Sequence, residues 1–283
     1  MIEQPQLSYF VEFINALGVA AENFVLVGAQ AMRFWQQKVR YTKDTDLILG
    51  AYQLARSDIK IADVLESLNY EVVQEAQRFQ FSKDIPESEE KMRLEFLASE
   101  QGVIPDGFRI NIQENVHAHK CLGAEVAIKE SEFKIITGPL PNGEVVTVGI
   151  RVAKPHALLM LKLFAMDDRN KNIRGPKEAE HDRERARVHA ADVVTLVNDN
   201  INNPEFIEKF WKQFGDDVGL EERTVNILTE CYKDEKNKLP GIQLYREFLN
   251  GQGETDIDEK VNRALREIQY ILSVAPKDID QNN

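Results

Sequence analysis

The chain has 283 residues, which is enough for one large domain or two ordinary ones. It contains 43% hydrophobic and 29% charged residues, as globular proteins do, and no apolar run approaches the length of a membrane span, so we expect no membrane partner. The formal net charge of −12 argues against a broadly basic nucleic-acid-binding surface, while a local basic groove remains compatible with it.

The start of the chain and its cysteines indicate a compartment. Residues 1–5 lack the basic start and apolar core of a secretory signal. Cys121 and Cys231 are the only cysteines, and they lie far apart and outside any metal-type pair. Two reduced thiols in a cytoplasmic protein are the simplest interpretation.

A helix, a strand and a tight turn open the predicted fold. Apolar residues recur with helical spacing over residues 7–17, and residues 24–27 form a short run of strand formers. Gly28 then lets the backbone turn sharply and lets a ligand approach closely. We expect a helix over residues 29–37, with its N-terminal N–H groups pointing at an anion above Gly28.

The second predicted strand, which ends at residue 49, carries two aspartates near its start. Asp44 and Asp46 are two residues apart, so their carboxylates project to the same face of an extended chain. Two anions held there repel each other unless a cation neutralises them. Mg²⁺ suits this role because it binds one or two carboxylates together with phosphate oxygens, and Mn²⁺ is the alternative.

These segments share the order of a known signature, in which a small-residue turn precedes a helix and a strand carries paired aspartates. The residues that carry it here are Gly28, Ala29, Arg40, Thr42, Asp44 and Asp46. The pattern resembles the DNA polymerase β-type nucleotidyltransferases. With Leu47 after the second aspartate, it is most similar to the AbiEii-type branch, whose members include toxins of toxin–antitoxin pairs. Ala29 departs from the Gly or Ser that is usual there, which weakens the expected phosphate contact.

The resemblance implies roles for these residues. Asp44 and Asp46 would hold the metal ion on the β- and γ-phosphates of a nucleoside triphosphate. The remaining four would bind the nucleotide, and they are Gly28, Ala29, Arg40 and Thr42.

The middle of the first half alternates between helix and strand patterns. We expect a helix over residues 55–68 and strands over 70–74, 78–81 and 91–98, with residues 84–90 as an acidic, solvated connector. Glu95 lies on the face of the last strand opposite Leu94 and Phe96. By resemblance it matches the third carboxylate of the superfamily, where Asp is usual. It would then complete the metal site and help to deprotonate an acceptor hydroxyl. The alternative is an ordinary glutamate on a solvent-facing strand surface.

Residues 102–123 are rich in loop-forming residues, with a short strand expected over 108–112. His117, His119 and Cys121 would share one face if extended, and all three are zinc-competent ligand types. No fourth ligand lies nearby in the sequence, so a polar loop is the preferred interpretation. Strands over 133–137 and 145–150 flank Pro141-Asn-Gly143, a hairpin signal that would close the sheet.

Helical patterns fill the rest of the chain from Pro155, which suits a first helical turn. We expect helices over residues 155–166, 177–197, 204–214, 221–234, 242–249 and 257–274. The predicted fold class is therefore α/β in the α+β sense. A mixed-sheet nucleotidyltransferase domain over residues 1–152 would precede a helical domain over residues 153–283.

Basic and acidic residues in the early helices carry a further part of the resemblance. Lys162 lies in an otherwise apolar helix and Arg169 follows seven residues later, on nearly the same side. The AbiEii-type pattern implies that this lysine contacts the triphosphate, and it matches the late acidic residue to Asp192, with Asp182 as the rival. The alternatives are a lysine that reaches water at the helix edge and a helix face of ordinary ion pairs. The basic run 169–177 is expected to form a mobile loop that could meet a triphosphate or an RNA backbone, or be merely solvated.

The preferred prediction is a metal-dependent nucleotidyltransferase that moves a nucleotidyl group from a nucleoside triphosphate to an acceptor hydroxyl. By resemblance the acceptor could be a tRNA 3′ end or a protein side chain, and an antitoxin could be a partner. The rival is a non-catalytic module of the same fold that binds a nucleotide or a partner protein. Ala29 and Glu95, both departures from the usual residue types, support that rival.

Overall fold

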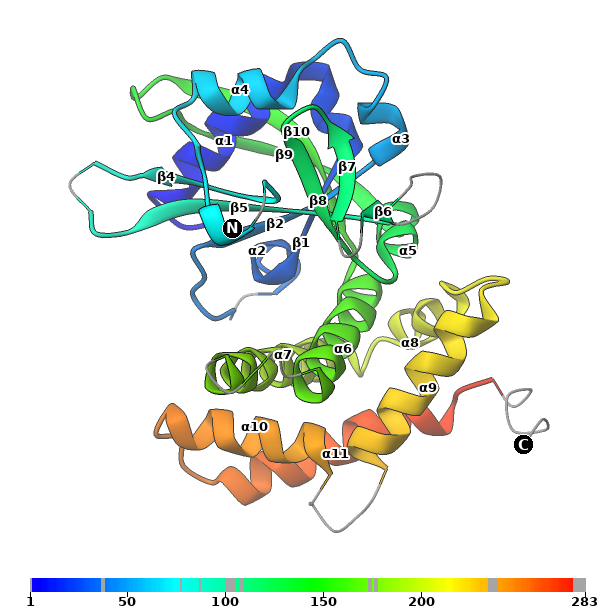
Figure 1. The fold of residues 1–283 in the computed structure, drawn as a ribbon. Coiled ribbons are helices and arrows are strands. Elements are labelled where there is room, and N and C mark those ends of the chain that lie inside the picture. The colour runs from blue at the N-terminus through cyan, green and yellow to red at the C-terminus, as the bar shows by residue number, and fades with distance from the viewer. Residues whose placement is uncertain are drawn as a thin grey trace. The chain divides into compact units, whose positions relative to one another are not determined.

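The computed structural model describes residues 2–36, 39–76, 78–86, 88–99, 105–106, 109–172, 175, 178–233 and 239–276. The chain divides into two compact units, Met1–Lys154 and Pro155–Asn283 (Figure 1). The first unit contains a mixed sheet with helices and the second is helical, which confirms the predicted α/β fold class. The division falls between residues 154 and 155, whereas the sequence places it between 152 and 153.

The sheet of the first unit has ten strands within the described residues. Their bounds are β1 Phe24–Val27, β2 Asp44–Leu49, β3 Glu71–Val72, β4 Gln80–Asp84, β5 Lys91–Ala98, β6 Pro105–Asp106, β7 Arg109–Gln113, β8 Val116–Lys120, β9 Ser131–Pro139 and β10 Val145–Ala153. The order is β6-β7-β8-β5-β2-β1-β10-β9, with β4 paired to β5 and β3 paired to β4. The β1–β10, β2–β5 and β5–β8 pairs are parallel and the others are antiparallel, so β2 lies in the interior of the sheet.

Five helices accompany this sheet in the described residues: α1 Gln6–Leu17, α2 Gly28–Met32, α3 Ala51–Leu54, α4 Ile61–Ser67 and α5 Ala124–Lys129. The predicted helix over residues 7–17 is confirmed as α1, which buries Phe10, Phe13 and Ile14. The Phe13 ring lies 6.0 Å from Phe24 on β1 and 6.3 Å from Phe96 on β5, centroid to centroid. This aromatic core fixes the central strands that carry the candidate site.

Several predicted elements have different bounds in the structure. The helix expected over residues 29–37 ends at Met32, because the chain continues in tighter turns and the Trp35 indole donates a hydrogen bond to Ala153 O on β10 (2.8 Å). The helix expected over residues 55–68 is replaced by the separate helices α3 and α4. The loop expected at His117–Cys121 is wrong, since strand β8 covers most of it and pairs with both β5 and β7. Residue 108, the expected start of a strand, lies outside the described residues.

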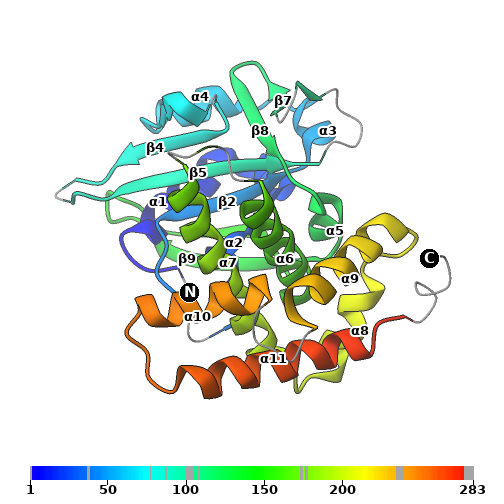
Figure 2. The ribbon, with the colours of Figure 1, turned by 60° about the horizontal axis from the view of Figure 1, so that its bottom comes forward.

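The second unit contains α6 Pro155–Lys171, α7 Ala179–Asn200, α8 Pro204–Lys212, α9 Val218–Tyr232, α10 Pro240–Gly251 and α11 Ile257–Ser273 (Figure 2). Every helix predicted after residue 153 is therefore present, with shifted ends. The Trp211 indole donates to Ile271 O (3.1 Å), which joins α8 to α11, and the Tyr232 side chain of α9 is fully buried. None of the helices in the described part of the chain is long and apolar enough to cross a membrane.

The basic run predicted as a loop begins in a helix. Helix α6 continues through Arg169 to Lys171, so the first three residues of the run are helical rather than looped. Residues 173–174 and 176–177 lie outside the described part of the chain. The prediction of a loop therefore concerns residues that follow α6.

Candidate active site

Strand pairing brings the predicted carboxylates to neighbouring positions on the sheet. Asp46 on β2 is paired with Val27, the last residue of β1, on one side and with Glu95 on β5 on the other. Asp44 is paired with Arg93 on the same neighbouring strand. Asp44, Asp46 and Glu95 are all partly exposed, whereas Thr45 between the two aspartates is buried. The three carboxylates therefore share one face of two adjacent parallel strands.

The turn after β1 leaves room for the Asp46 carboxylate because residue 28 is glycine. Gly28 has φ +69°, a backbone conformation that residues other than glycine rarely adopt. A Cβ atom placed there would lie 1.9 Å from Asp46 Oδ2 and 2.8 Å from Asp46 Cγ. The carboxylate thus occupies the space that any side chain at residue 28 would need.

A glutamine on the next strand orients the third carboxylate. Gln80 Nε2 on β4 donates a hydrogen bond to Glu95 Oε2 (2.9 Å). This contact leaves the other carboxylate oxygen available for a different partner. Gln80 was not predicted from the sequence, because the pairing of β4 with β5 in this register had no local signal.

The segment before Asp44 is held by polar side chains that follow Gly28. Gln30 Nε2 donates to Thr42 O and Arg33 Nη2 donates to Arg40 O, each at 3.0 Å. Gln30 is buried and the Arg33 guanidinium also contacts Glu3. Thr42 Oγ1 in turn accepts a hydrogen bond from Asp44 N (3.3 Å). Thr42 and Arg40, which the signature singles out, are thus connected to the strand that carries the aspartates.

Gln30 and Arg33 were missed by the sequence analysis. Their signal is two polar residues, three positions apart, in a segment whose other residues are apolar. Ala29, the remaining member of the signature, is buried within α2. Helix α2 has only five residues, so its dipole gives weaker support to an anion than the longer predicted helix would.

The donor set suits a hard divalent cation. Asp44, Asp46 and Glu95 offer only carboxylate oxygens, which Mg²⁺ and Mn²⁺ prefer. Within the residues described, however, the His, Cys, Asp and Glu side chains form no group of three or more that could hold one metal ion. The carboxylates share a face but would have to converge by side-chain rotation to bind a common ion.

Cys121 lies near these carboxylates, which the sequence did not indicate. Its N–H donates to Ala98 O (2.9 Å) where β8 runs beside β5. Burial, with the negative charges of Asp46 and Glu95, raises the pKa of the Cys121 thiol to about 12. The thiol therefore stays protonated at neutral pH in the metal-free protein. His117 and His119 precede it on β8, but no metal-binding group is found among the described residues there, so the zinc alternative gains no support.

The sequence profile of a family described as nucleotidyltransferase matches residues 6–214. The chain belongs to this nucleotidyltransferase family. Members of such families typically use a divalent metal ion and a nucleoside triphosphate. The match covers both the strands that carry the paired carboxylates and the first helices of the second unit.

Two solved structures from Helicobacter pylori are also similar to this chain. One is a candidate nucleotidyltransferase, 14% identical, with 96% of each chain covered and a TM-score of 0.38. The other is JHP933, 11% identical, with 96% of this chain and 94% of that chain covered and a TM-score of 0.36. Identity and TM-score are both too low for these structures to indicate a function for this chain. No curated protein matches the chain.

In the second unit, the residues predicted to contact the nucleotide are paired with one another. Lys162 Nζ on α6 lies 2.7 Å from Asp192 Oδ2 on α7, and both side chains are almost fully buried. Two turns along, Arg169 Nη1 lies 3.1 Å from Asp182 Oδ1, whose side chain is 0% exposed. Both rival acidic residues therefore have a basic partner on α6. This arrangement favours the structural alternative, and a nucleotide role for these residues stays a prediction.

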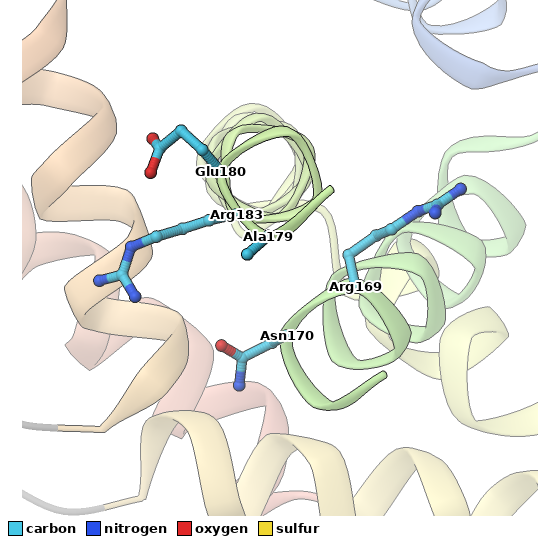
Figure 3. Close-up of a pocket in the computed structure, with 5 residues that line it drawn as sticks. All are labelled: Arg169, Asn170, Ala179, Glu180 and Arg183. Carbon is cyan, nitrogen blue, oxygen red and sulfur yellow. The ribbon is translucent and has the colours of Figure 1, made fainter. Parts of the chain in front are cut away.

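A small pocket of about 160 Å³ lies where α6 ends and α7 begins (Figure 3). Its lining residues are Arg169, Asn170, Ala179, Glu180 and Arg183. Figure 3 shows Arg169 and Arg183 directed away from each other. Sites for drug-sized ligands usually have roughly 300–1,000 Å³, so this pocket is too small for a nucleoside triphosphate.

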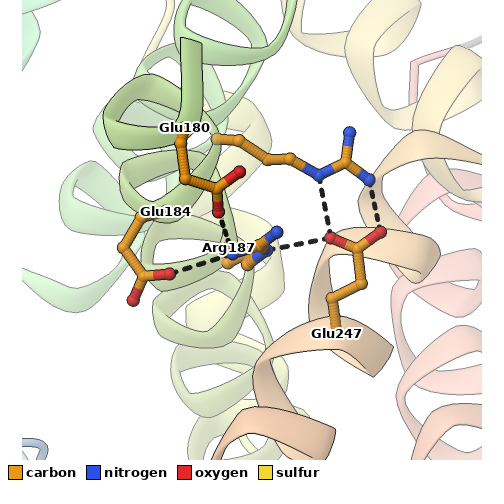
Figure 4. Close-up of polar contacts among 5 residues, drawn as sticks. Glu180, Glu184, Arg187 and Glu247 are labelled. Atoms are coloured by element: carbon orange, nitrogen blue, oxygen red, sulfur yellow. Dashed lines mark hydrogen bonds and ion pairs between the residues drawn. The ribbon is translucent and has the colours of Figure 1, made fainter. Parts of the chain in front are cut away.

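The cations beside this pocket already have carboxylate partners. Arg183 pairs with Glu247 on α10, and Arg187 Nε donates to the same carboxylate (2.9 Å) while its Nη1 contacts Glu180 and Glu184 (Figure 4). The two arginines lower the pKa of Glu247. This network joins α7 to α10, so we interpret these arginines as structural.

Proposed function

We propose that this chain is a metal-dependent nucleotidyltransferase that transfers a nucleotidyl group from a nucleoside triphosphate to an acceptor hydroxyl. The observation that supports it most is the position of the Asp46 carboxylate, which lies against Gly28 and beside Glu95 in a member of a nucleotidyltransferase family. Only glycine at this turn leaves room for the Asp46 carboxylate, so the turn supports a metal ligand beside the other carboxylates.

The chain's own residues would divide the work as follows. Asp44, Asp46 and Glu95 would hold Mg²⁺ or Mn²⁺, which when bound supplies positive charge to the phosphates. Glu95, with one oxygen fixed by Gln80, would accept the proton of the acceptor hydroxyl. The hydroxyl oxygen then bonds to the α-phosphorus as the bond to pyrophosphate breaks. Gln30 and Arg33 would keep the Arg40–Thr42 segment in place beside the nucleotide.

The finer proposal concerns the branch and the acceptor. The run Arg40-x-Thr42-x-Asp44-x-Asp46 resembles the AbiEii-like branch, for which a tRNA 3′ end or a protein side chain would accept the nucleotide. A toxin role with an antitoxin partner belongs to the same proposal. Lys162, Arg169 and Asp192 enter it by resemblance alone, because the structure supplies each with an ion-pair partner.

The first experiment tests the metal site. Asp44→Asn together with Asp46→Asn removes the anionic pair that a cation would neutralise, so binding of a triphosphate with Mg²⁺ or Mn²⁺ should be lost in calorimetry. Stability should hold or rise slightly, because the like charges no longer repel each other. Unchanged affinity in a folded double variant would refute the assignment.

A second experiment separates the enzyme from the rival, a non-catalytic module of the same fold. Glu95→Gln keeps the size of the side chain and removes the base. Pyrophosphate release should fall by roughly 10²- to 10⁴-fold while triphosphate affinity stays close to that of the unaltered chain. If the unaltered protein binds triphosphate but never releases pyrophosphate with tRNA or protein acceptors, the binding module is the better description.

A further inference from the structure

Strand β9 lies at one end of the sheet and pairs only with β10 among the described strands. It is nine residues long, and two of its apolar side chains, Phe133 and Ile135, are 51% and 71% exposed. Val145, at the start of β10, is 65% exposed. A long edge strand with exposed apolar side chains is suited to pairing with another strand.

The hydrogen-bond pattern shows which backbone groups of β9 face away from β10. Leu140 N donates to Glu144 O (2.7 Å) at one end of the hairpin, and Lys154 N donates to Glu130 O (2.9 Å) at the other. Hydrogen-bonded pairs alternate along an antiparallel ladder, so the even-numbered residues of β9 bond to β10. The N–H and C=O groups of Phe133, Ile135 and Thr137 therefore point to the outer edge.

The side chains on the exposed face leave Ile135 as the most prominent residue. The Phe133 ring folds over β10, where a Cβ on Gly149 would lie 2.1 Å from Phe133 Cζ. Thr137 Oγ1 lies 2.9 Å from Thr147 Oγ1, also on β10. Ile135 stands between these two side chains.

We propose that β9 pairs with β9 of a second copy of this chain, antiparallel about a two-fold axis through Ile135. In this register the strands overlap along their whole length, and the outward groups of Phe133, Ile135 and Thr137 meet complementary groups. Ile135 lies opposite the partner's Ile135, and Phe133 lies opposite the partner's Thr137. The interface is isologous, as in most homodimers.

Charge and backbone chemistry favour this register over its neighbours. Lys134 Nζ lies 2.6 Å from Glu132 Oε1 of the same strand, so the charged pair is neutral within each copy. A shift that centres the axis on Lys134 would place two ammonium groups opposite each other, which is destabilising. A shift toward Pro139 shortens the overlap and moves Pro139, which has no N–H, from the end of the ladder opposite Ser131 to a position opposite Phe133. The register through Ile135 therefore gives the longest overlap and avoids opposed ammonium groups.

This proposal does not depend on the proposed function. Strands β10 and β1 lie between β9 and β2 in the sheet, so the edge does not include the carboxylates. Failure of the enzyme assays would leave the pairing untouched, and the converse also holds.

Sedimentation velocity of the full chain tests the association. The unaltered protein should show a concentration-dependent dimer, and Ile135→Lys should shift it toward monomer because two ammonium groups would lie directly opposite each other at the axis. Val19→Lys is the matched control, since Val19 is 80% exposed elsewhere in the same unit and the added charge is the same. Circular dichroism checks that each variant is folded. A monomeric unaltered protein, or a dimer that survives Ile135→Lys, would overturn the proposal, as would pairing with a different protein instead of a second copy.

Cysteine cross-linking tests the register. Directly opposite residues in a hydrogen-bonded antiparallel pair have Cα atoms about 5.5 Å apart, within the range of a disulfide. Ile135→Cys should therefore give a covalent dimer under mild oxidation, whereas Phe133→Cys, which faces Thr137, should not. The unaltered chain, with Cys121 and Cys231, reports background cross-linking. A covalent dimer from Phe133→Cys but not from Ile135→Cys would overturn the two-fold arrangement through Ile135.

Discussion

The Asp46 carboxylate fills the space that a side chain of residue 28 would occupy, where β1 ends and α2 begins. The glycine is required for its positive φ, and it is required again because Asp46 Oδ2 fills the position of a Cβ. A substitution at residue 28 would strain the turn and also displace a proposed metal ligand. The two effects can be separated, because Gly18 also has a positive φ but has no atom near its Cβ position.

Gly28→Ala tests this double requirement, with Gly18→Ala as the matched control. Gly18 has φ +54° and ψ −129° and nothing within 4 Å of its Cβ position, so alanine there should cost only the backbone strain, about 1–3 kcal/mol. Gly28→Ala should cost more and should also abolish metal-dependent triphosphate binding, because the Asp46 carboxylate must move. Chemical denaturation and calorimetry measure both quantities. Equal losses of stability, with binding retained in both variants, would contradict the prediction.

At the scale of elements, helices α6 and α7 are joined by one buried and one part-buried ion pair. Lys162 pairs with Asp192, and Arg169, two turns further along α6, pairs with Asp182, which precedes Asp192 on α7. The order reverses because the helices are antiparallel. A buried pair gains little net stability over an apolar pair of similar volume, but removing one partner leaves an uncompensated charge. The pairing therefore constrains which substitutions α6 tolerates.

Lys162→Met should destabilise the protein by about 3–5 kcal/mol, because it leaves the Asp192 carboxylate buried without its partner. Lys162→Met combined with Asp192→Leu should recover most of that loss, since both charges are then absent. Thermal or chemical unfolding completes the double-mutant cycle. Titration of a fluorescent triphosphate provides the second readout. An unchanged dissociation constant in the stable double variant would identify the pair as structural, and a weaker one would restore Lys162 to the nucleotide site.

Local sequence patterns were sufficient for most of the elements. Strand β5 was predicted with its observed bounds, because its alternation of apolar and polar residues is regular from Lys91 to Ala98. The helices of the second unit followed from their 3.6-residue period and their Pro and Gly ends. Asp44 and Asp46 could be placed on one face of their strand, and Glu95 on the polar face of its own, because side chains alternate along a strand. That the two faces coincide depends on the pairing of β2 with β5, which the sequence did not show.

Such local patterns could not predict contacts between segments that are far apart in the sequence. Cys121 comes near Asp46 only because β8 pairs with β5, and Lys162 meets Asp192 only because α7 folds back on α6. Helix α5 follows Gly123 in a stretch too short for a clear period. The predicted loop at His117 failed because its polar residues belong to a strand that two neighbours stabilise.

At the scale of the whole molecule, the connection between the two units has no linker residue without a structural role. Lys154 N is hydrogen-bonded to Glu130 O of the first unit, and the next residue, Pro155, begins α6. Pro155 also has a restricted φ and no N–H. The chain passes from strand β10 to helix α6 through one residue, Lys154.

Inserting a flexible Gly-Ser segment of about eight residues between Lys154 and Pro155 tests whether both units take part in catalysis. If Lys162 or Arg169 acts on a triphosphate bound by Asp44 and Asp46, pyrophosphate release should fall while each unit stays folded. The same segment inserted between Asn142 and Gly143, in the exposed hairpin turn, is the control and should have no effect. Equal activity of the two insertion variants would restrict catalysis to the first unit.

The covalent connection also sets how the chain responds to dilution. Any cooperation between the two units is intramolecular, because one covalent chain carries both, and it does not depend on the protein concentration. Intramolecular cooperation between the units would therefore persist at the lowest concentration at which the chain is present. Separate polypeptides for the two units would lose that advantage and would have to meet by diffusion. A β9-paired dimer, in contrast, would dissociate on dilution, so activity that survives dilution would belong to the single chain.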